Sequence, residues 1–220
     1  MIVSDRARCG GRSARIQASV HQAVKDLLVA VERADLTVPL IATRAGVTPS
    51  TIYRRWGDLA GLLADVAVDR LRPALDPIDT GALETDLQAW VEQYTEEMSS
   101  GPGRALIRDV LSNAPDATHA GRCSGYTTAQ LQIIGDRAIA RQGVALDVER
   151  VVDHVVAPIM YRILFGDAPP NLAYCHALIE RALADTAPLP ARLRCRLADP
   201  RAPDSDAPDG SRRSDLRAPA

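Results

Sequence analysis

Hydroxyl and guanidinium side chains are concentrated in one short stretch of the chain, between residues 37 and 55. Serine, threonine and tyrosine hydroxyls can hydrogen-bond to phosphate oxygens and base edges, and arginine guanidinium groups bind phosphate or guanine. The chemistry available to these groups is contact with double-stranded DNA. The candidate contact residues are Thr37, Arg44, Thr48, Ser50, Thr51, Tyr53, Arg54 and Arg55.

Two short helices are predicted to carry these side chains. Thr37 can cap the first helix, whose apolar residues recur at helical spacing as far as Ala45. Gly46 then supplies a residue that tolerates left-handed dihedrals, so the chain is expected to turn there. Thr48 can cap a second helix, with Pro49 in its first position, where the missing amide hydrogen is no loss.

The second helix, residues 50–56, is predicted to have two unlike sides. Ile52 and Trp56 lie four residues apart and are expected to face inward together, while the hydroxyls and arginines face outward. Two short helices, a glycine turn and a polar outer side are typical of a helix-turn-helix. The alternative is a helical hairpin inside another kind of all-α domain, with its arginines merely solvated.

The run LTVPLIATRAGVTPSTIYRRW, residues 36–56, resembles the DNA-binding signature of TetR-family transcriptional regulators. That pattern has a Thr-initiated helix, Ile-Ala, Ala-Gly-Val, a hydroxyl residue, and a Tyr-rich recognition helix closed by an aromatic residue. The resemblance covers residues 14–72 and implies an all-α protein. It would have an N-terminal three-helix DNA-binding domain and a C-terminal helical domain for ligand binding and dimerisation. The matching positions are Thr37, Ile41, Ala42, Ala45, Gly46, Val47, Thr48, Ile52, Tyr53 and Trp56.

One departure from the family pattern lies directly after Trp56. The family places a small or acidic cap there and then a lysine that contacts phosphate, whereas this chain continues with Gly57, Asp58 and Leu59. Asp58 can still cap the next helix, but Leu59 cannot bind phosphate. Gly61 occupies the place where a glutamate would complete a capping box. A TetR-like helical dimer that binds a small molecule but has lost DNA binding is therefore an alternative function.

Charge is distributed unevenly along the 220 residues. Residues 1–72 carry 11 Lys and Arg against 7 Asp and Glu, while residues 73–220 carry 15 against 21. A basic part joined to an acidic part is typical of a protein that presents one end to nucleic acid, although solvated helix faces give the same imbalance. Residues 1–13 are predicted to be a flexible basic arm, and residues 14–72 the helix-turn-helix domain with a connecting helix from Leu59.

The C-terminal part, residues 73–186, shows helical periodicity and no strand-like alternation, which predicts an all-α ligand-binding and dimerisation domain. Thr80 is the expected cap of its first helix, a turn is expected over 99–103, and Pro158 should kink the helix that contains it. Residues 187–220 are rich in Pro, Arg and Asp, so this tail is predicted to be disordered. The expected helices are 80–98, 104–113, 126–142, 147–165 and 171–184.

The last two of these helices carry more apolar residues than one packed side needs. In the TetR family the final two helices form a four-helix interface with a twin subunit, so the resemblance implies a homodimer, which can read a palindromic operator. The alternative is that these apolar residues form the core of the single chain. The predicted interface residues are Val152, Val155, Val156, Ile159, Ile163, Leu178, Ile179 and Leu183.

The resemblance also implies a small-molecule site among the C-terminal helices. The function it predicts is a sequence-specific, homodimeric repressor that an unidentified ligand releases from its operator. The alternative for each candidate is an ordinary core residue, which is the commoner role of such side chains. The candidates are Trp90, Tyr94, Met98, Tyr126, His154 and Tyr161.

Catalysis, metal and cofactor binding have no support in the sequence. His154 follows Asp153 and His176 follows Cys175, but adjacent helical side chains diverge by about 100° and form no dyad or metal pair. No phosphate-binding glycine loop, nucleophile elbow or paired-histidine zinc motif is present. Scattered cysteines, the lack of an apolar secretory core and the lack of a membrane-length apolar run predict a non-enzymatic, cytoplasmic protein without a membrane partner.

Overall fold

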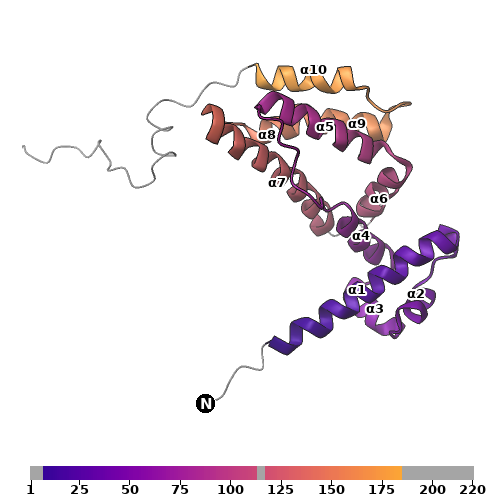
Figure 1. Cartoon of the computed structure of the whole chain (residues 1–220). Helices are drawn as coiled ribbons and strands as arrows, with labels where there is room; N and C mark the ends of the chain where they lie inside the picture. Colours follow the sequence, from indigo (N-terminus) through magenta and orange to yellow (C-terminus); the bar gives the residue numbers. More distant parts are fainter. Residues whose placement is uncertain (1–6, 113–116, 185–220) are drawn as a thin grey trace, which may run out of the picture.

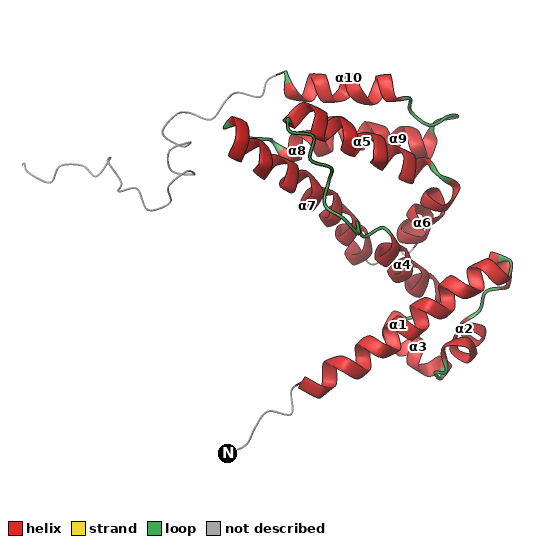
Figure 2. Ribbon diagram, viewed as in Figure 1, coloured by secondary structure: helices red, strands yellow, loops and turns green. Residues whose placement is uncertain are grey.

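The computed structural model describes residues 7–112 and 117–184 (Figure 1). These residues form helices joined by turns and loops, with no β-strand in the described ranges, as the sequence predicts (Figure 2). The elements are α1 (Ala7–Ala30), the 3-10 turn η1 (Arg33–Asp35), α2 (Val38–Ala45), α3 (Pro49–Trp56), α4 (Leu59–Arg70), α5 (Leu83–Ser99), α6 (Gly101–Ser112), α7 (Ala117–Gln142), α8 (Val148–Val151), the π-helical turn η2 (Val152–Val156), α9 (Ala157–Phe165) and α10 (Leu172–Leu183).

Helices α1 to α4 form one part of the molecule, which we call the head, residues 7–70 (Figure 1). Their apolar sides meet in a single core, in which α1 supplies Val20 and Val24, α2 supplies Ile41, and α3 supplies Ile52. The first half of α4 completes this core with Leu62, Leu63 and Val66. Burial of these side chains holds the two short helices α2 and α3, which would be marginal in isolation.

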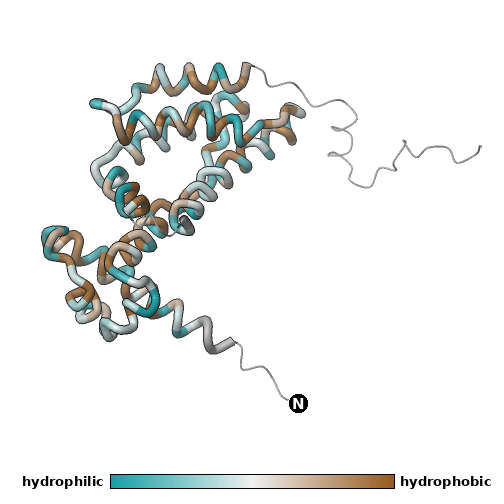
Figure 3. The backbone as a smooth tube through the Cα atoms, turned by 180° about the vertical axis from the view of Figure 1, so that it is seen from behind, coloured by the Kyte–Doolittle hydropathy of each residue, from teal (hydrophilic) through white to brown (hydrophobic). Residues whose placement is uncertain are grey.

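Helices α5 to α10 form the other part, which we call the body, residues 83–184. Its core is separate from that of the head. In Figure 3, hydrophobic and hydrophilic residues alternate around the body helices, as expected of helices with one buried side. Residues with almost no exposed surface include Leu87, Leu131, Ile134, Ile159, Ile163 and Ile179.

Helix α4 joins the two parts and is buried along most of its length. Every residue from 61 to 68 is buried. The first half of the helix packs in the head, whereas Ala67 and Val68 pack with Val110 of α6. An apolar helix buried on all sides couples its neighbours mechanically, because none of them can shift without disturbing its packing.

Several element boundaries differ from the sequence-based expectations. Helix α1 begins at Ala7, so residues 7–13 of the predicted flexible arm are helical. Helix α6 begins at Gly101 within the expected turn, because the Ser100 hydroxyl accepts a hydrogen bond from the Gly103 amide at 2.9 Å. Gly103 is required there, since a Cβ atom would collide with the carbonyl oxygen of Glu97.

The body also shows differences. Helix α7 begins at Ala117, well before the expected start at Tyr126. Thr80 does not cap α5; its amide and hydroxyl instead donate to the Asp86 carboxylate, each at 2.6 Å. Pro158 lies in the first turn of α9, and the irregularity it causes is the π-helical turn directly before it. Residues 1–6 of the predicted arm and the tail 187–220 lie outside the described residues.

Candidate DNA-binding surface and its attachment to the body

The turn between α2 and α3 forms as its residue types predict. Thr37 precedes α2 with extended backbone, and its hydroxyl accepts a hydrogen bond from the Leu40 amide at 3.4 Å. Gly46 ends α2 in the left-handed conformation, with φ of 69°, which is strained for any other residue. The local sequence therefore fixes the angle at which α3 leaves α2.

A cluster of hydroxyl groups lies at the start of α3. The Thr48 hydroxyl lies 3.0 Å from the hydroxyls of both Ser50 and Thr51. Thr48 precedes the helix, as predicted, but its side chain makes no capping hydrogen bond. Thr48 and Ser50 are exposed and Thr51 is half-buried, so the first turn of α3 presents hydroxyl groups to the outside.

The two sides of α3 differ as predicted. Ile52 has 0% of its surface exposed and lies in the head core, whereas Tyr53 is 49% exposed. Arg54 is also exposed, and no described residue binds its guanidinium group. The outer side of α3 thus offers a phenol and a guanidinium group beside the hydroxyl cluster.

The other two candidate arginines have partners within the head. Arg44 donates to Asp26 of α1 at 2.9 Å. Arg55 donates to the Ser13 carbonyl and hydroxyl at 2.9 Å and to the Gln17 side chain at 3.3 Å. Arg55 therefore joins the end of α3 to α1, which separates its role from that of its neighbour Arg54.

The departure from the family pattern after Trp56 has a structural reason. Asp58 caps α4 by accepting a hydrogen bond from the Gly61 amide at 2.8 Å, as predicted. Gly61 is not a weak point, because a Cβ atom there would collide with the Trp56 carbonyl oxygen. Leu59 is half-buried against the head core, so the position of the usual lysine is occupied by a packing side chain.

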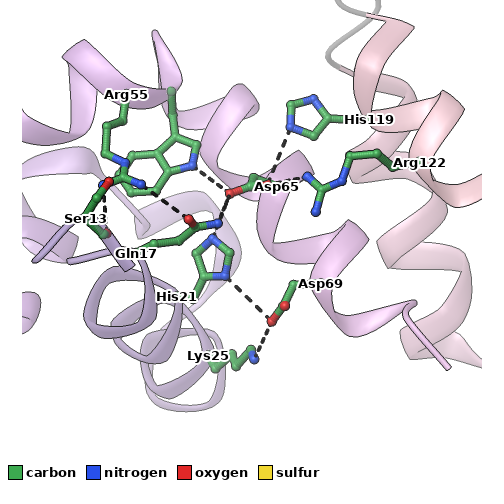
Figure 4. Close-up of polar contacts among 10 residues, drawn as sticks. Ser13, Gln17, His21, Lys25, Arg55, Asp65, Asp69, His119 and Arg122 are labelled. Carbon is green, nitrogen blue, oxygen red and sulfur yellow. Dashed lines mark hydrogen bonds and ion pairs between the residues drawn. The ribbon is translucent and has the colours of Figure 1, made fainter. Parts of the chain in front are cut away.

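Asp65 is the central polar residue of the head and is not among the site residues that the sequence predicts. It is only 5% exposed in the middle of α4, yet both of its carboxylate oxygens are bonded (Figure 4). Oδ2 accepts hydrogen bonds from the Gln17 amide at 3.2 Å, His21 Nε2 at 2.9 Å and Trp56 Nε1 at 2.9 Å. Oδ1 accepts one from Arg122 of α7 at 2.8 Å.

The Asp65 carboxylate is stabilised in its charged form. Burial alone would raise its pKa, but the hydrogen bonds from His21, Trp56 and Arg122 outweigh burial and hold the pKa well below its usual range. One signal in the sequence pointed to this residue. A single acidic residue inside the apolar run LLADVAV must be buried, and a buried carboxylate needs partners.

An open cavity of about 310 Å³ lies beside Asp65, between the head and α7. The head contributes Gln17, Arg55 and Trp56 to its walls, and the start of α7 contributes Thr118 and His119. The His119 ring lies 3.9 Å from Oδ1 of Asp65. The junction between head and body is therefore polar and partly hollow.

The structure divides the six predicted ligand-site residues. Trp90 and Tyr94 stack at 5.0 Å in the body core, close to Met98 on the same helix. Burial raises the pKa of Tyr94 to about 12, against a lowering effect of its hydrogen bond with Thr127. Tyr126 lies on α7 near the end of α4, where its hydroxyl accepts a hydrogen bond from Arg72 at 3.2 Å.

Two predicted ligand-site residues lie on the surface. His154 is exposed, and Tyr161 is 67% exposed. Trp90, Tyr94 and Met98 lie together at the body core, and Tyr94 bonds to Thr127, the residue after Tyr126. The six candidates therefore do not all lie in one place, and their role as a ligand site stays a prediction. Helical periodicity could not separate them, because it places a residue on a side of its helix without saying which element covers that side.

The predicted dimer-interface residues are core residues of the single chain, as the alternative interpretation held. Six of them are 0–7% exposed, and the half-buried Val152 and Leu183 pack against the same core. The large exposed apolar residues of α9 and α10 are Tyr161, Phe165 at 73% exposure, and Leu172. The six buried residues, which are not available to a second subunit, are Val155, Val156, Ile159, Ile163, Leu178 and Ile179.

Neither a metal site nor a membrane span is found among the described residues. No group of three or more His, Cys, Asp and Glu side chains in residues 7–112 and 117–184 is placed to hold a metal ion. No helix in those ranges is long and apolar enough to cross a bilayer.

His176 contacts Glu92 at 2.9 Å, which links α10 to α5.

Comparisons with known proteins agree on one family. Residues 33–66 match the family of bacterial regulatory proteins called tetR, and residues 77–182 match the C-terminal domain of tetracyclin repressor-like proteins. The chain is 26% identical over 170 residues to the uncharacterized HTH-type transcriptional regulator YdeS of Bacillus subtilis, covering 74% of this chain and 86% of YdeS. It is 25% identical over 150 residues to the uncharacterized HTH-type transcriptional regulator Rv1556 of Mycobacterium tuberculosis, covering 66% and 74%.

Solved structures give the same answer. The crystal structure of the TetR-family transcription regulator SCO0332 superposes with a TM-score of 0.57 at 28% identity, covering 79% of this chain and 100% of that one. A TetR transcriptional regulator from Agrobacterium tumefaciens shares the fold with a TM-score of 0.51 at 19% identity, covering 80% and 95%. Matches to both the N-terminal and C-terminal domains, in the expected order, place this chain in the TetR family of helix-turn-helix transcriptional regulators.

Proposed function

We propose that the chain is a homodimeric repressor that binds a palindromic operator and leaves it when a small molecule binds the body. The observation that carries the proposal is the outer side of α3, where Tyr53, Arg54 and a hydroxyl cluster are exposed while Ile52 anchors the helix. A helix with those groups on its open side can enter a major groove. In a bacterium its DNA lies in the cytoplasm, where we place the protein.

The proposed DNA-contact residues differ in whether their side chains already have partners within the head. Thr37 and Thr48 lie at helix N-termini, where hydroxyl and amide groups can bind phosphate. Four side chains can contact base edges or the DNA backbone without breaking an ion pair: those of Ser50, Thr51, Tyr53 and Arg54. Arg44 is bonded to Asp26 and Arg55 to α1, so each has fewer free N–H donors for DNA than Arg54.

The second subunit docks on the exposed surfaces of α9 and α10. Tyr161 and Phe165 form a tilted ring pair at 5.2 Å, and Leu172 is the exposed apolar residue at the start of α10. Exposed aromatic residues of this kind are typical of interfaces, because a twin chain can bury both pairs at once. A two-fold dimer would place two copies of α3 about one DNA turn, roughly 34 Å, apart.

The ligand is proposed to act through the body near the stacked Trp90 and Tyr94. A ligand shifts the equilibrium between bound and released forms only by its difference in affinity for them. It must therefore favour a body conformation in which the two heads no longer match successive major grooves.

The test is a binding titration of the purified chain against DNA from its own upstream region. We expect specific binding with a steep salt dependence, since phosphate contacts release counterions. Tyr53→Ala should weaken binding by roughly tenfold, about 1.4 kcal/mol, and leave the melting temperature nearly unchanged, because the side chain is exposed. Gln93→Ala, in the exposed part of α5, is the control.

The alternative is a TetR-like dimer that binds a small molecule and no longer binds DNA. The packing of Leu59 in place of a phosphate-binding lysine favours it. Affinity that is independent of DNA sequence, or insensitive to Tyr53→Ala, would support this alternative over the repressor.

A further inference from the structure

The two oxygens of the Asp65 carboxylate serve different parts of the molecule. Oδ2 is bonded only by head residues, from α1 and α3, whereas Oδ1 is bonded by Arg122 from the body (Figure 4). The side chain thus lies where three helices meet α4. Its near-complete burial means that it depends on these partners for its solvation.

On the head side, the carboxylate fixes the end of α3. Trp56 is the last residue of that helix, and its indole nitrogen donates to Oδ2 at 2.9 Å. The same oxygen holds His21 and Gln17 of α1, and the His21 ring also lies 3.7 Å from Asp69. The position of α3 is therefore set by a carboxylate on α4 as well as by apolar packing.

On the body side, Arg122 of α7 donates a hydrogen bond to Oδ1 of this carboxylate, and the His119 ring of the same helix lies 3.9 Å from the same oxygen. The Arg122 guanidinium lies 2.8 Å from Oδ1 although its side chain is only partly buried. Arg72, at the end of α4, lies over the ring of Tyr126, one turn further along α7. The bonds from Arg122 and Trp56 to the two oxygens of Asp65 therefore link α7 to the end of α3.

We propose that Arg122 and Asp65 are positioning residues for DNA recognition, which together hold α3 at a fixed orientation to the body. The inference rests on the proposed DNA-binding function. In a dimer the bodies are joined, so fixing each head to its body also fixes the separation of the two copies of α3. Without Arg122 each head keeps its own fold, its ion pair from Arg33 to Asp109 and the packing of α4 on α6, but it has lost one fixed contact with α7 and moves more freely. Binding a second half-site must then restrict that motion.

The first experiment measures the head–body distance directly and needs no DNA. Spin labels on unnatural amino acids at Val29 of α1 and Glu96 of α5, both exposed, avoid the four native cysteines. Labelled chains are diluted with unlabelled chains so that only distances within one chain are recorded. We expect Arg122→Gln to broaden the distance distribution, and Arg122→Lys, which keeps a charged donor, to restore a narrower one.

Arg137→Gln is the matched control for this measurement. Arg137 lies on the same helix, is partly buried and donates to the Pro77 carbonyl at 2.7 Å, but it does not touch the head. We expect its distribution to equal that of the wild type. If Arg122→Gln also gives the wild-type distribution, the proposal is overturned.

The second experiment compares a palindromic operator with a duplex that contains one half-site. Arg122→Gln should weaken binding to the palindrome by about fivefold to tenfold and leave half-site binding unchanged, because only the palindrome requires both heads in register. An equal loss on both duplexes, or no loss on either, would overturn the proposal. If the wild type shows no sequence preference at all, the repressor function fails, while the distance distributions still decide whether Arg122 fixes the head.

Discussion

Two Arg–Asp ion pairs among the described residues join the head to the body, and they differ in how many other donors bond the carboxylate. In one, Asp65 of the head binds Arg122 of α7; in the other, Arg33 of η1 in the head binds Asp109 of α6 in the body. Both carboxylates are buried and both arginines are partly or largely exposed. The pKa of Asp65 is lowered, whereas that of Asp109 is raised.

The number of donors explains the opposite directions. Burial is the largest effect on the pKa of each carboxyl and raises both. Asp65 has several donors from three helices, which more than offset burial. The Asp109 carboxylate accepts a hydrogen bond from Arg33, and this single bond lowers the pKa by less than burial raises it. A buried ion pair therefore stabilises a junction only when the carboxylate's remaining lone pairs are also bonded.

The largest effect should come from Asp65→Asn. The substitution keeps the shape but removes the charge, and its amide group points a donor at other donors, so we expect a loss of about 2–4 kcal/mol in the free energy of unfolding. Urea denaturation followed by circular dichroism measures it. Asp69→Asn, one turn later on α4 and more exposed, is the matched control and should cost less than about 1 kcal/mol. Equal losses would mean that Asp65 is not the centre of the junction.

The two carboxyl groups should change the pH dependence of the free energy of unfolding in opposite directions. A lowered pKa makes Asp65 contribute stability above the ordinary aspartate value, about 3.9, and lose it as the pH falls further. The raised pKa of Asp109 acts oppositely: its contribution is present below the ordinary value and is lost as the pH rises through the folded-state pKa. Unfolding free energies measured between pH 3 and 6 should therefore fall less steeply toward acid in Asp65→Asn, and more steeply in Asp109→Asn, than in the wild type.

The sequence predicted the DNA-binding elements because their signals are local. Caps, a glycine turn and a four-residue apolar repeat lie within twenty residues, so α2 and α3 could be placed with their inner and outer sides. Asp65 could not be assigned its partners in this way, since His21, Trp56 and Arg122 are brought to it by the fold. Only its isolation in an apolar run signalled burial.

Hydrophobic periodicity predicted less about the body than local signals predicted about the head. It recognised the apolar surfaces of α9 and α10 but could not tell a twin subunit from the chain's own core, and residues such as Ile159 and Ile163 proved to be core. It also missed the first turns of α7, where glycines and polar residues have weak helix propensity. Packing of Cys123 and Tyr126 against α4 and α6 overrides that propensity.

The smallest effect should come from Asp109→Asn, and it tests the comparison most directly. Because burial disfavours the Asp109 carboxylate more than Arg33 favours it, replacing it with a neutral amide should change the unfolding free energy at pH 7 by less than about 1 kcal/mol, in the stabilising direction if at all. Arg33→Gln, which leaves the buried carboxylate without this donor, should be more harmful than Asp109→Asn. Paired urea titrations of the two variants measure the difference. If Asp109→Asn were instead as destabilising as Asp65→Asn, the number of donors would not be what separates the two ion pairs.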